Sequence, residues 1–362
     1  MAHRFNHPKP ITTNGMGAVV TTTAPPAGTA AEQFALRRRS PLQRIQHLLH
    51  SRPAISPFLV LIISFVVFAT INPRFASPNS LSLVLQQVAV IGALAVGQTL
   101  VILTAGIDLS VGAITILSMM VAAKVAEGHG VPGVVAVLIG IGLGLAGGAL
   151  NGALVTRIGL PPFIVTLGTL SVFTAVGLLY TRGQSVQATD LPDLLNWTGE
   201  SFAVGRFRIT VGVVLVAVLY ILVGFALANT AWGRHVYAVG DDKEAARLAG
   251  IRVDRVLLSA YLVAGGIYGL TAWILIGRAG AASPNAITDA NLESITAVVI
   301  GGTSLFGGRG AVLGTLLGAL IVGFFRSGLS LAGVDDQYRV LAVGLLVLVA
   351  VAVDQWIRRV KA

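Results

Sequence analysis

Few residues of this chain could do chemistry in an apolar setting. Asp108 and Glu293 are the only candidates for a proton relay among its long apolar segments. Cysteine is absent, and the six histidines lie in the amino-terminal tail or in loops, so no metal site of ordinary spacing is expected. The sequence also lacks the patterns GxxxxGK[ST], HExxH and GxSxG. We therefore expect no catalytic residue, no metal site and no cofactor bound by the chain itself.

The composition predicts an all-α polytopic membrane protein. Hydrophobic types make up 55% of the 362 residues and charged types only 11%, whereas a soluble domain carries about 25% charged residues. A crossing helix needs about 20 mostly apolar residues. About ten transmembrane helices are expected, with eight to eleven as the range. The candidate segments are 54–71, 81–106, 109–126, 131–157, 161–181, 209–229, 255–277, 290–303, 311–331 and 334–356.

The segment 290–303 is the shortest of the ten and contains Glu293 and a glycine pair. It either crosses the membrane or re-enters it, and re-entry is tolerated only where protein or a cavity surrounds the backbone. We count it as a crossing.

Basic residues predict the orientation. Residues 1–52 have the character of a disordered, basic cytoplasmic tail, ahead of a transmembrane domain at 53–357 and a short cytoplasmic tail at 358–362. With ten crossings, 17 of the 25 Lys and Arg residues fall on the cytoplasmic side and 8 on the other. This excess satisfies the positive-inside rule with both termini in the cytoplasm. The net charge of +10 therefore indicates topology, and no nucleic-acid partner is expected.

The polar loop 230–254 has the pattern of a compact helix. Asp241 is placed to cap its amino end, and Glu244 three residues later would complete a capping box. Gly250 is placed to end it in a left-handed turn.

A helix of about eight residues is marginal alone in water, so it must dock on something. Ala245, Leu248 and Ile251 would be its apolar contacts. It is either packed on its own bundle, or it is a rigid lever that enters a groove in a partner.

Four motifs stand out in the chain. They are GRHVYAVG (233–240) with EAARLAGI (244–251), GQTLVILTAGIDLSVG (97–112), NGALVTR (151–157) with PPFIVTLGTL (161–170), and VVIGGTSLFGGRG (298–310). Together they resemble the permease subunits of bacterial ATP-binding-cassette (ABC) importers of the ribose, xylose, galactose and arabinose type, within the branched-chain-amino-acid/sugar permease superfamily. The resemblance covers roughly residues 55–357. One departure is Gly240-Asp241-Asp242, where the family usually has Gly-Asn or Gly-Gly-Asn.

The resemblance implies a type II importer-like bundle in the bacterial plasma membrane. Two permeases, identical or paralogous, would pair with two cytoplasmic ATPases, which hydrolyse ATP, and an extracytoplasmic binding protein would deliver the sugar. A pentose or hexose would then cross by alternating access. The residues implied in ATPase coupling are Gly240, Asp241, Asp242, Glu244, Ala245, Ala246, Leu248, Gly250 and Ile251.

A neutral sugar needs hydrogen-bonding groups and an aromatic face along its path. Each candidate could equally be an interhelical contact. Asp108 has three interpretations: it caps the following helix with Ser110, pairs with an arginine, or contacts sugar hydroxyls. The candidate path residues are Gln98, Asp108, Asn151, Phe163, Thr166 and Trp273.

The glycine-rich turn around Arg309 is expected to make tight turns and close helix packing. A phosphate cradle is disfavoured there because no strand precedes it. Two alternative functions stay open at this point. One is a secondary transporter driven by ions or protons, and the other is a membrane assembly protein that transports nothing.

Overall fold

The computed structural model describes residues 55–359, so the expected tail at 1–52 lies outside the described residues. Helices dominate this range. The α-helices are α3 (Ile55–Ile71), α4 (Pro78–Leu103), α5 (Val111–His129), α6 (Gly133–Arg157), α7 (Pro162–Thr181), α8 (Asp193–Asn196), α9 (Val211–Asn229), α10 (Ala231–Asp241), α11 (Lys243–Leu248), α12 (Val253–Ala279), α13 (Ala290–Ile300), α14 (Val312–Leu331) and α15 (Asp336–Arg359).

Within residues 55–359, four short strands form two antiparallel pairs. One pair joins β1 (Val186–Gln187) to β4 (Ala281–Ala282). The other is a hairpin of β2 (Ser201–Val204) and β3 (Phe207–Thr210), with Ser201 opposite Thr210. Short 3-10 turns lie at 73–76, 188–190 and 197–199.

Each of the ten apolar segments of the sequence is a helix in the structure. Six are long and apolar enough to cross a membrane by length and composition, namely α4, α6, α7, α9, α12 and α14. The helix α13 has only 11 residues, which corresponds to about 16 Å against a hydrocarbon core of about 30 Å. The chain nevertheless passes from one end of the bundle to the other over this stretch, because Gly277 before it packs on Gly199 beside the β2–β3 hairpin, whereas Gly308 after it packs on Asp241 at the end of α10. This favours the crossing that was counted for 290–303, and the short helix covers only part of it.

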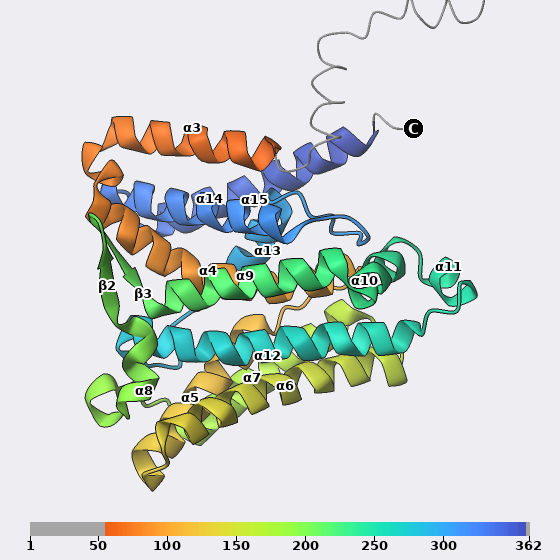
Figure 1. Cartoon of the computed structure of the whole chain (residues 1–362), viewed down its shortest axis with the longest axis horizontal. Coiled ribbons are helices and arrows are strands. Elements are labelled where there is room, and N and C mark those ends of the chain that lie inside the picture. The colour runs from red at the N-terminus through yellow and green to blue at the C-terminus, as the bar shows by residue number, and fades with distance from the viewer. Residues whose placement is uncertain (1–54, 360–362) are drawn as a thin grey trace, which may run out of the picture. The chain divides into compact units, whose positions relative to one another are not determined.

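The two ends of the bundle are defined by the elements that flank α9. The β2–β3 hairpin precedes α9, and α10 and α11 follow it, so they lie at opposite ends of this helix, as Figure 1 shows. We call these the hairpin end and the α11 end.

The helices α4 and α12 lie at the centre, each with 67% of its apolar stretch buried. Glycines let α6 pack on α12 backbone to backbone: a Cβ added at Gly148 would lie 2.2 Å from the carbonyl oxygen of Tyr261, and one at Gly144 would lie 2.3 Å from that of Gly265. Such close approach is how helices associate in membranes.

The short helix α13 is held against α14 by charge as well as by packing. Arg326 of α14 donates a hydrogen bond to the buried carboxylate of Glu293 in α13. A Cβ added at Gly318 would lie 1.9 Å from the carbonyl oxygen of Ala297. The cost of burying Glu293 is therefore offset by a cation from the neighbouring helix.

The α6–α12 contact gives a first prediction. Gly148→Ala places a methyl group against the backbone of α12, and overpacking of this kind costs about 1–3 kcal/mol. We expect the thermal unfolding midpoint of the purified protein to fall by several degrees. Gly142→Ala on the same helix is the control, because a Cβ there meets no atom within 4 Å. Equal midpoints for the two variants would contradict the close contact.

Candidate functional site at the α11 end of the bundle

The helix α11 is short and capped at both ends. The Asp242 carboxylate accepts hydrogen bonds from the backbone N–H groups of Glu244 (2.9 Å) and Ala245 (3.0 Å). The prediction that Asp241 caps this helix was therefore wrong by one residue. The reason is that α10 continues through Asp241, so that Asp242 is the first extended residue, with φ −154° and ψ 111°.

The predicted capping box is also incomplete. The Glu244 side chain accepts a hydrogen bond from Arg247 at 2.9 Å, on an exposed surface where such a pair contributes little. At the other end Gly250 adopts φ 82°, which confirms the left-handed turn. The backbone N–H of Ile251 donates to the carbonyl of Ala246 at 3.0 Å and closes this end.

The helix α11 has an inner and an outer face. Ala246 is buried against the bundle and Ile251 packs against the main core, so Ile251 does not point outward as a contact for a partner. Leu248 is the opposite case, with 90% of its surface exposed. One face of α11 therefore rests on the bundle, and the other presents an apolar side chain to the outside. The interpretation as a lever that enters a partner stays a prediction.

The end of α10 rests directly on two other backbone segments. A Cβ at Gly240 would lie 1.8 Å from the carbonyl oxygen of Leu103, the last residue of α4. The same Leu103 oxygen accepts a hydrogen bond from Gly308 N at 3.0 Å, and the Tyr237 hydroxyl donates to the Gly310 carbonyl at 2.9 Å. We call Leu103, Gly240 and Gly308 the junction.

The glycine-rich turn around Arg309 packs closely against the junction, and this contact requires glycine at two of its positions. Gly307 and Gly308 have φ of 87° and 69°, and Cβ atoms there would meet the backbones of Gly240 and Asp241. The prediction of tight turns and close packing for this segment is confirmed. No pattern in the sequence indicated that its partner would be the end of α4.

The connection between α4 and α5 runs from the junction to a buried polar network. Ala105 adopts φ 59°, which is uncommon for a residue other than glycine. Asp108 Oδ1 then accepts hydrogen bonds from Ser110 N (2.8 Å) and Ser110 Oγ (2.6 Å). Asp108 is thus bonded to Ser110, the N-cap residue of α5, and it also interacts with the Tyr268 hydroxyl of α12; among the described residues no ion pair joins it to an arginine.

The network continues from Ser110 into α6 and α7. The Asn151 amide donates to Ser110 Oγ at 2.8 Å, and Thr169 donates to Asn151 Oδ1 at 2.8 Å. Thr166 donates to the Ile107 carbonyl at 2.9 Å. Three of the candidate path residues, Asp108, Asn151 and Thr166, therefore lie close together in one polar network.

The other three candidate path residues are placed elsewhere. Gln98 lies in the interior of α4 and accepts a hydrogen bond from the Tyr268 hydroxyl at 3.4 Å. Trp273 stacks on Trp197 and donates to the Leu194 carbonyl at 2.8 Å. Phe163 is exposed. The assignment of these six residues to a sugar path stays a prediction.

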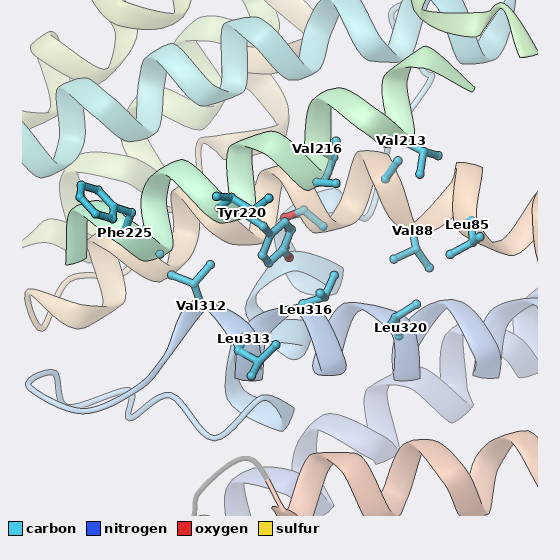
Figure 2. Close-up of a pocket in the computed structure, with 15 residues that line it drawn as sticks. Leu85, Val88, Val213, Val216, Tyr220, Phe225, Val312, Leu313, Leu316 and Leu320 are labelled. Carbon is cyan, nitrogen blue, oxygen red and sulfur yellow. Dashed lines mark hydrogen bonds between the residues drawn. The ribbon is translucent and has the colours of Figure 1, made fainter. Parts of the chain in front are cut away.

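A cavity of about 560 Å³ lies between α4, α9 and α14 and is shown in Figure 2. Its lining is apolar apart from Tyr220, whose hydroxyl is already used in a hydrogen bond to the Gly92 carbonyl at 3.0 Å. Because a sugar presents hydroxyl groups that need polar partners, this cavity does not have the chemistry of a sugar site.

Comparison with known proteins gives one family and several close relatives. A family model described as branched-chain amino acid transport system / permease component matches residues 80–351. The chain is 48% identical to the fructose import permease protein of Rhizobium meliloti, over 93% of this chain and 94% of that protein. It is 38% identical to the ribose import permease protein of Bacillus subtilis, over 83% and 92% of the two chains.

A further relative is the D-allose transport system permease protein of Escherichia coli, at 35% identity over 83% of this chain and 91% of that protein. No solved structure matches the chain. The family match and the relatives each span most of the described helices. The chain therefore belongs to the family of branched-chain amino acid transport system permease components.

Proposed function

We propose that this chain is the membrane permease of an ABC importer for a monosaccharide, and that α11 receives the movement of a partner ATPase. A permease of this kind is a transport component and not an enzyme. The observation that carries the proposal is Leu248, an apolar side chain on a short, doubly capped helix that stands 90% exposed beyond the bundle. The relatives named above are all sugar permeases.

The geometry of α11 suits a docking element. Its ends are fixed by Asp242 and Gly250, so little further ordering is needed when a partner binds. Full burial of a leucine side chain contributes about 1.5–3 kcal/mol. The partner should therefore offer an apolar groove, and the ATPase of the importer is the subunit that would bring it.

The junction gives the movement a route into the bundle. At Gly240 the backbone of α10 contacts the backbone of Leu103 with no side chain between them. A displacement of α10 therefore cannot be absorbed by a change of rotamer and must move the end of α4 and the turn before α14. Densely packed elements of this kind shift as rigid bodies.

The polar network extends the route to α5, α6 and α7 through Ser110. This residue donates to Asp108 and accepts from Asn151. In this proposal the connection between α4 and α5 is the second element that moves with α10.

The two carboxylates that could have formed a proton relay are both engaged. Asp108 is bonded to Ser110, and Glu293 pairs with Arg326. This favours ATP as the energy source over a proton gradient.

We further propose that both termini are cytoplasmic, that an extracytoplasmic binding protein delivers the sugar, and that a second permease, identical or paralogous, completes the pore. Because the fructose permease is the relative with 48% identity, fructose is the sugar to test first.

The proposal is tested by uptake into proteoliposomes that contain the permease, its candidate ATPase and the binding protein. Labelled fructose, ribose and allose are each supplied with and without ATP. We expect uptake of at least one sugar to require ATP. Uptake that continues without ATP or without the ATPase would contradict the proposed function.

In the same assay Leu248→Asp places a charge where an apolar groove is expected. We expect binding of the ATPase to weaken at least about tenfold, with ATP-driven uptake lost and the thermal midpoint of the permease unchanged. Leu248→Met keeps the apolar surface and is the matched control. If the aspartate variant co-purifies with the ATPase as the wild type does, α11 is not the docking helix.

The polar network gives a prediction about coupling. Ser110→Ala removes the hydroxyl that donates to Asp108 and accepts from Asn151, whereas the backbone N–H bond to Asp108 remains. The Asn151 amide loses its partner, and an unpaired buried polar group costs about 1–3 kcal/mol. We expect the ATPase to bind normally while more ATP is hydrolysed per sugar transported. Ser118→Ala on the same helix is the control, since the Ser118 hydroxyl has no partner among the described residues. If the ratio of ATP hydrolysed to sugar transported is unchanged in Ser110→Ala, the polar network does not take part in coupling.

The orientation is tested with single cysteines, because the natural chain has none. Glu244→Cys lies in α11 and Arg206→Cys lies in the exposed turn of the β2–β3 hairpin. In intact cells that lack the ATPase, a membrane-impermeant thiol reagent should label position 206 and should label position 244 only after permeabilisation. The reverse pattern would invert the proposed topology.

A further inference from the structure

The apolar cavity between α4, α9 and α14 is a groove that opens at one end. Its floor is α4, with buried residues such as Val88, and its walls are α9 and α14, as Figure 2 shows. At the hairpin end Leu85 and Val213 are only partly exposed, and β3 contacts both α4 and α9. At the α11 end Phe225 and Leu313 are 63% and 61% exposed. The groove is therefore covered at the hairpin end and open to the surface at the α11 end.

The groove is long and narrow. Its lining positions on α9 recur every three or four residues from Val213 to Phe225, a length of about 18 Å at the rise of an α-helix. Spread over that length, the volume of about 560 Å³ gives a mean cross-section of about 30 Å², whereas a helix about 10 Å wide needs about 80 Å². The groove is therefore too narrow for a helix of another protein or of a second copy, and it suits a thin chain.

The lining of the groove requires an apolar occupant. Each of the three helices that form it is long and apolar enough to cross a membrane, so the groove faces hydrocarbon. Among the residues that line it only Tyr220 has a polar side chain, and its hydroxyl donates to the Gly92 carbonyl. An occupant finds no free hydrogen-bonding side chain along this length, so a polar one would be left unpaired. A lipid acyl chain is the thin apolar chain that a membrane supplies.

Two arginines lie at the open end of the groove. Arg309 precedes the lining residue Val312 by three positions. Arg234 shares a face of α10 with Tyr237, which follows it by three residues, and the Tyr237 hydroxyl donates to the Gly310 carbonyl at 2.9 Å. Both arginines are exposed, and neither forms an ion pair with a residue in the range 55–359. The open end of the groove therefore carries positive charge.

We propose that this groove binds one acyl chain of an anionic phospholipid, with the lipid phosphate beside Arg234 and Arg309. Arginine forms strong, often bidentate hydrogen bonds with phosphate, and basic side chains at a membrane surface attract anionic headgroups. Two cations favour a lipid with a net negative charge over one whose phosphate is balanced by its own ammonium group. The site does not depend on the proposed transport function, because it needs neither a sugar nor an ATPase.

The headgroup is tested by native mass spectrometry of the purified full-length permease, stripped of lipid and then supplied with dioleoylphosphatidylglycerol or dioleoylphosphatidylcholine. We expect the phosphatidylglycerol to bind about tenfold more tightly. The double variant Arg234→Gln with Arg309→Gln should lose this preference. The matched control is Arg252→Gln with Arg255→Gln, which removes two exposed charges near the start of α12, a helix that does not line the groove.

Three results of this experiment would overturn the proposal. One is equal binding of the two lipids by the wild type. Another is an equal loss of preference in the two double variants, since the charge would then act without regard to its place. The third is displacement of the bound lipid by inorganic phosphate alone, because an anion site without an acyl chain would explain it.

The acyl chain is tested by filling the groove. Gly224 lines it, and a Cβ there meets no atom within 4 Å, so Gly224→Trp places an indole in the space of the chain. We expect binding of phosphatidylglycerol to weaken about tenfold or more. Gly142→Trp in α6 is the matched control, because a Cβ at Gly142 also meets no atom within 4 Å and α6 does not line the groove. Equal binding by the two variants would place the lipid elsewhere.

A last measurement uses the wild-type permease and so does not depend on the folding of a variant. Phosphatidylglycerol with a photoactivatable diazirine in its acyl chain is bound at one equivalent, irradiated, and located by peptide mass spectrometry. We expect the label mainly within 213–225 and 312–320, the stretches of α9 and α14 that line the groove. A label spread equally over the exposed face of α7 would show nonspecific contact with lipid and would refute the site.

Discussion

The contact between Gly240 and the carbonyl oxygen of Leu103 is the constraint on which the α11 end of the protein depends. No side chain fits there, since a Cβ would lie 1.8 Å from that oxygen. The same oxygen accepts the N–H of Gly308, so three segments that are distant in the sequence share one backbone atom. The position of α11 is thereby fixed relative to α4 and α14 by main-chain geometry, which is less adaptable than side-chain packing.

Polar groups inside the bundle are concentrated close to this contact. The network of Asp108, Ser110 and Asn151 begins a few residues after Leu103 and joins the starts of α5 and α7 to α6. The rest of the interior is held mainly by apolar side chains and by glycine contacts such as Gly148 with Tyr261. Elsewhere single polar contacts join pairs of helices, such as Thr99 with Thr315 and Glu293 with Arg326. Here one connected network joins α5, α6 and α7 and holds them in a defined register.

Much of the fold follows from the sequence because the hydrocarbon core imposes a length and a polarity on each helix. The ten segments were predictable on that basis. The left-handed turn at Gly250 was predictable for another reason, because glycine is favoured where a helix ends in a positive φ. The cap was misplaced because Asp241 and Asp242 are adjacent acids, and only the end of α10 decides between them. The hydrogen bond between Ser110 and Asn151 joins residues 41 positions apart. A local sequence pattern cannot predict a contact between residues so distant in the chain.

The pair of Glu293 and Arg326 has a consequence for how the chain enters the bilayer. Glu293 lies in the first turn of α13, and the 11 residues of that helix are too few to span the hydrocarbon core alone. The cation to which its carboxylate is hydrogen-bonded is made 33 residues later in synthesis, on α14. The carboxylate of α13 therefore meets that partner only after α14 has been made, which links the two helices in the order of assembly.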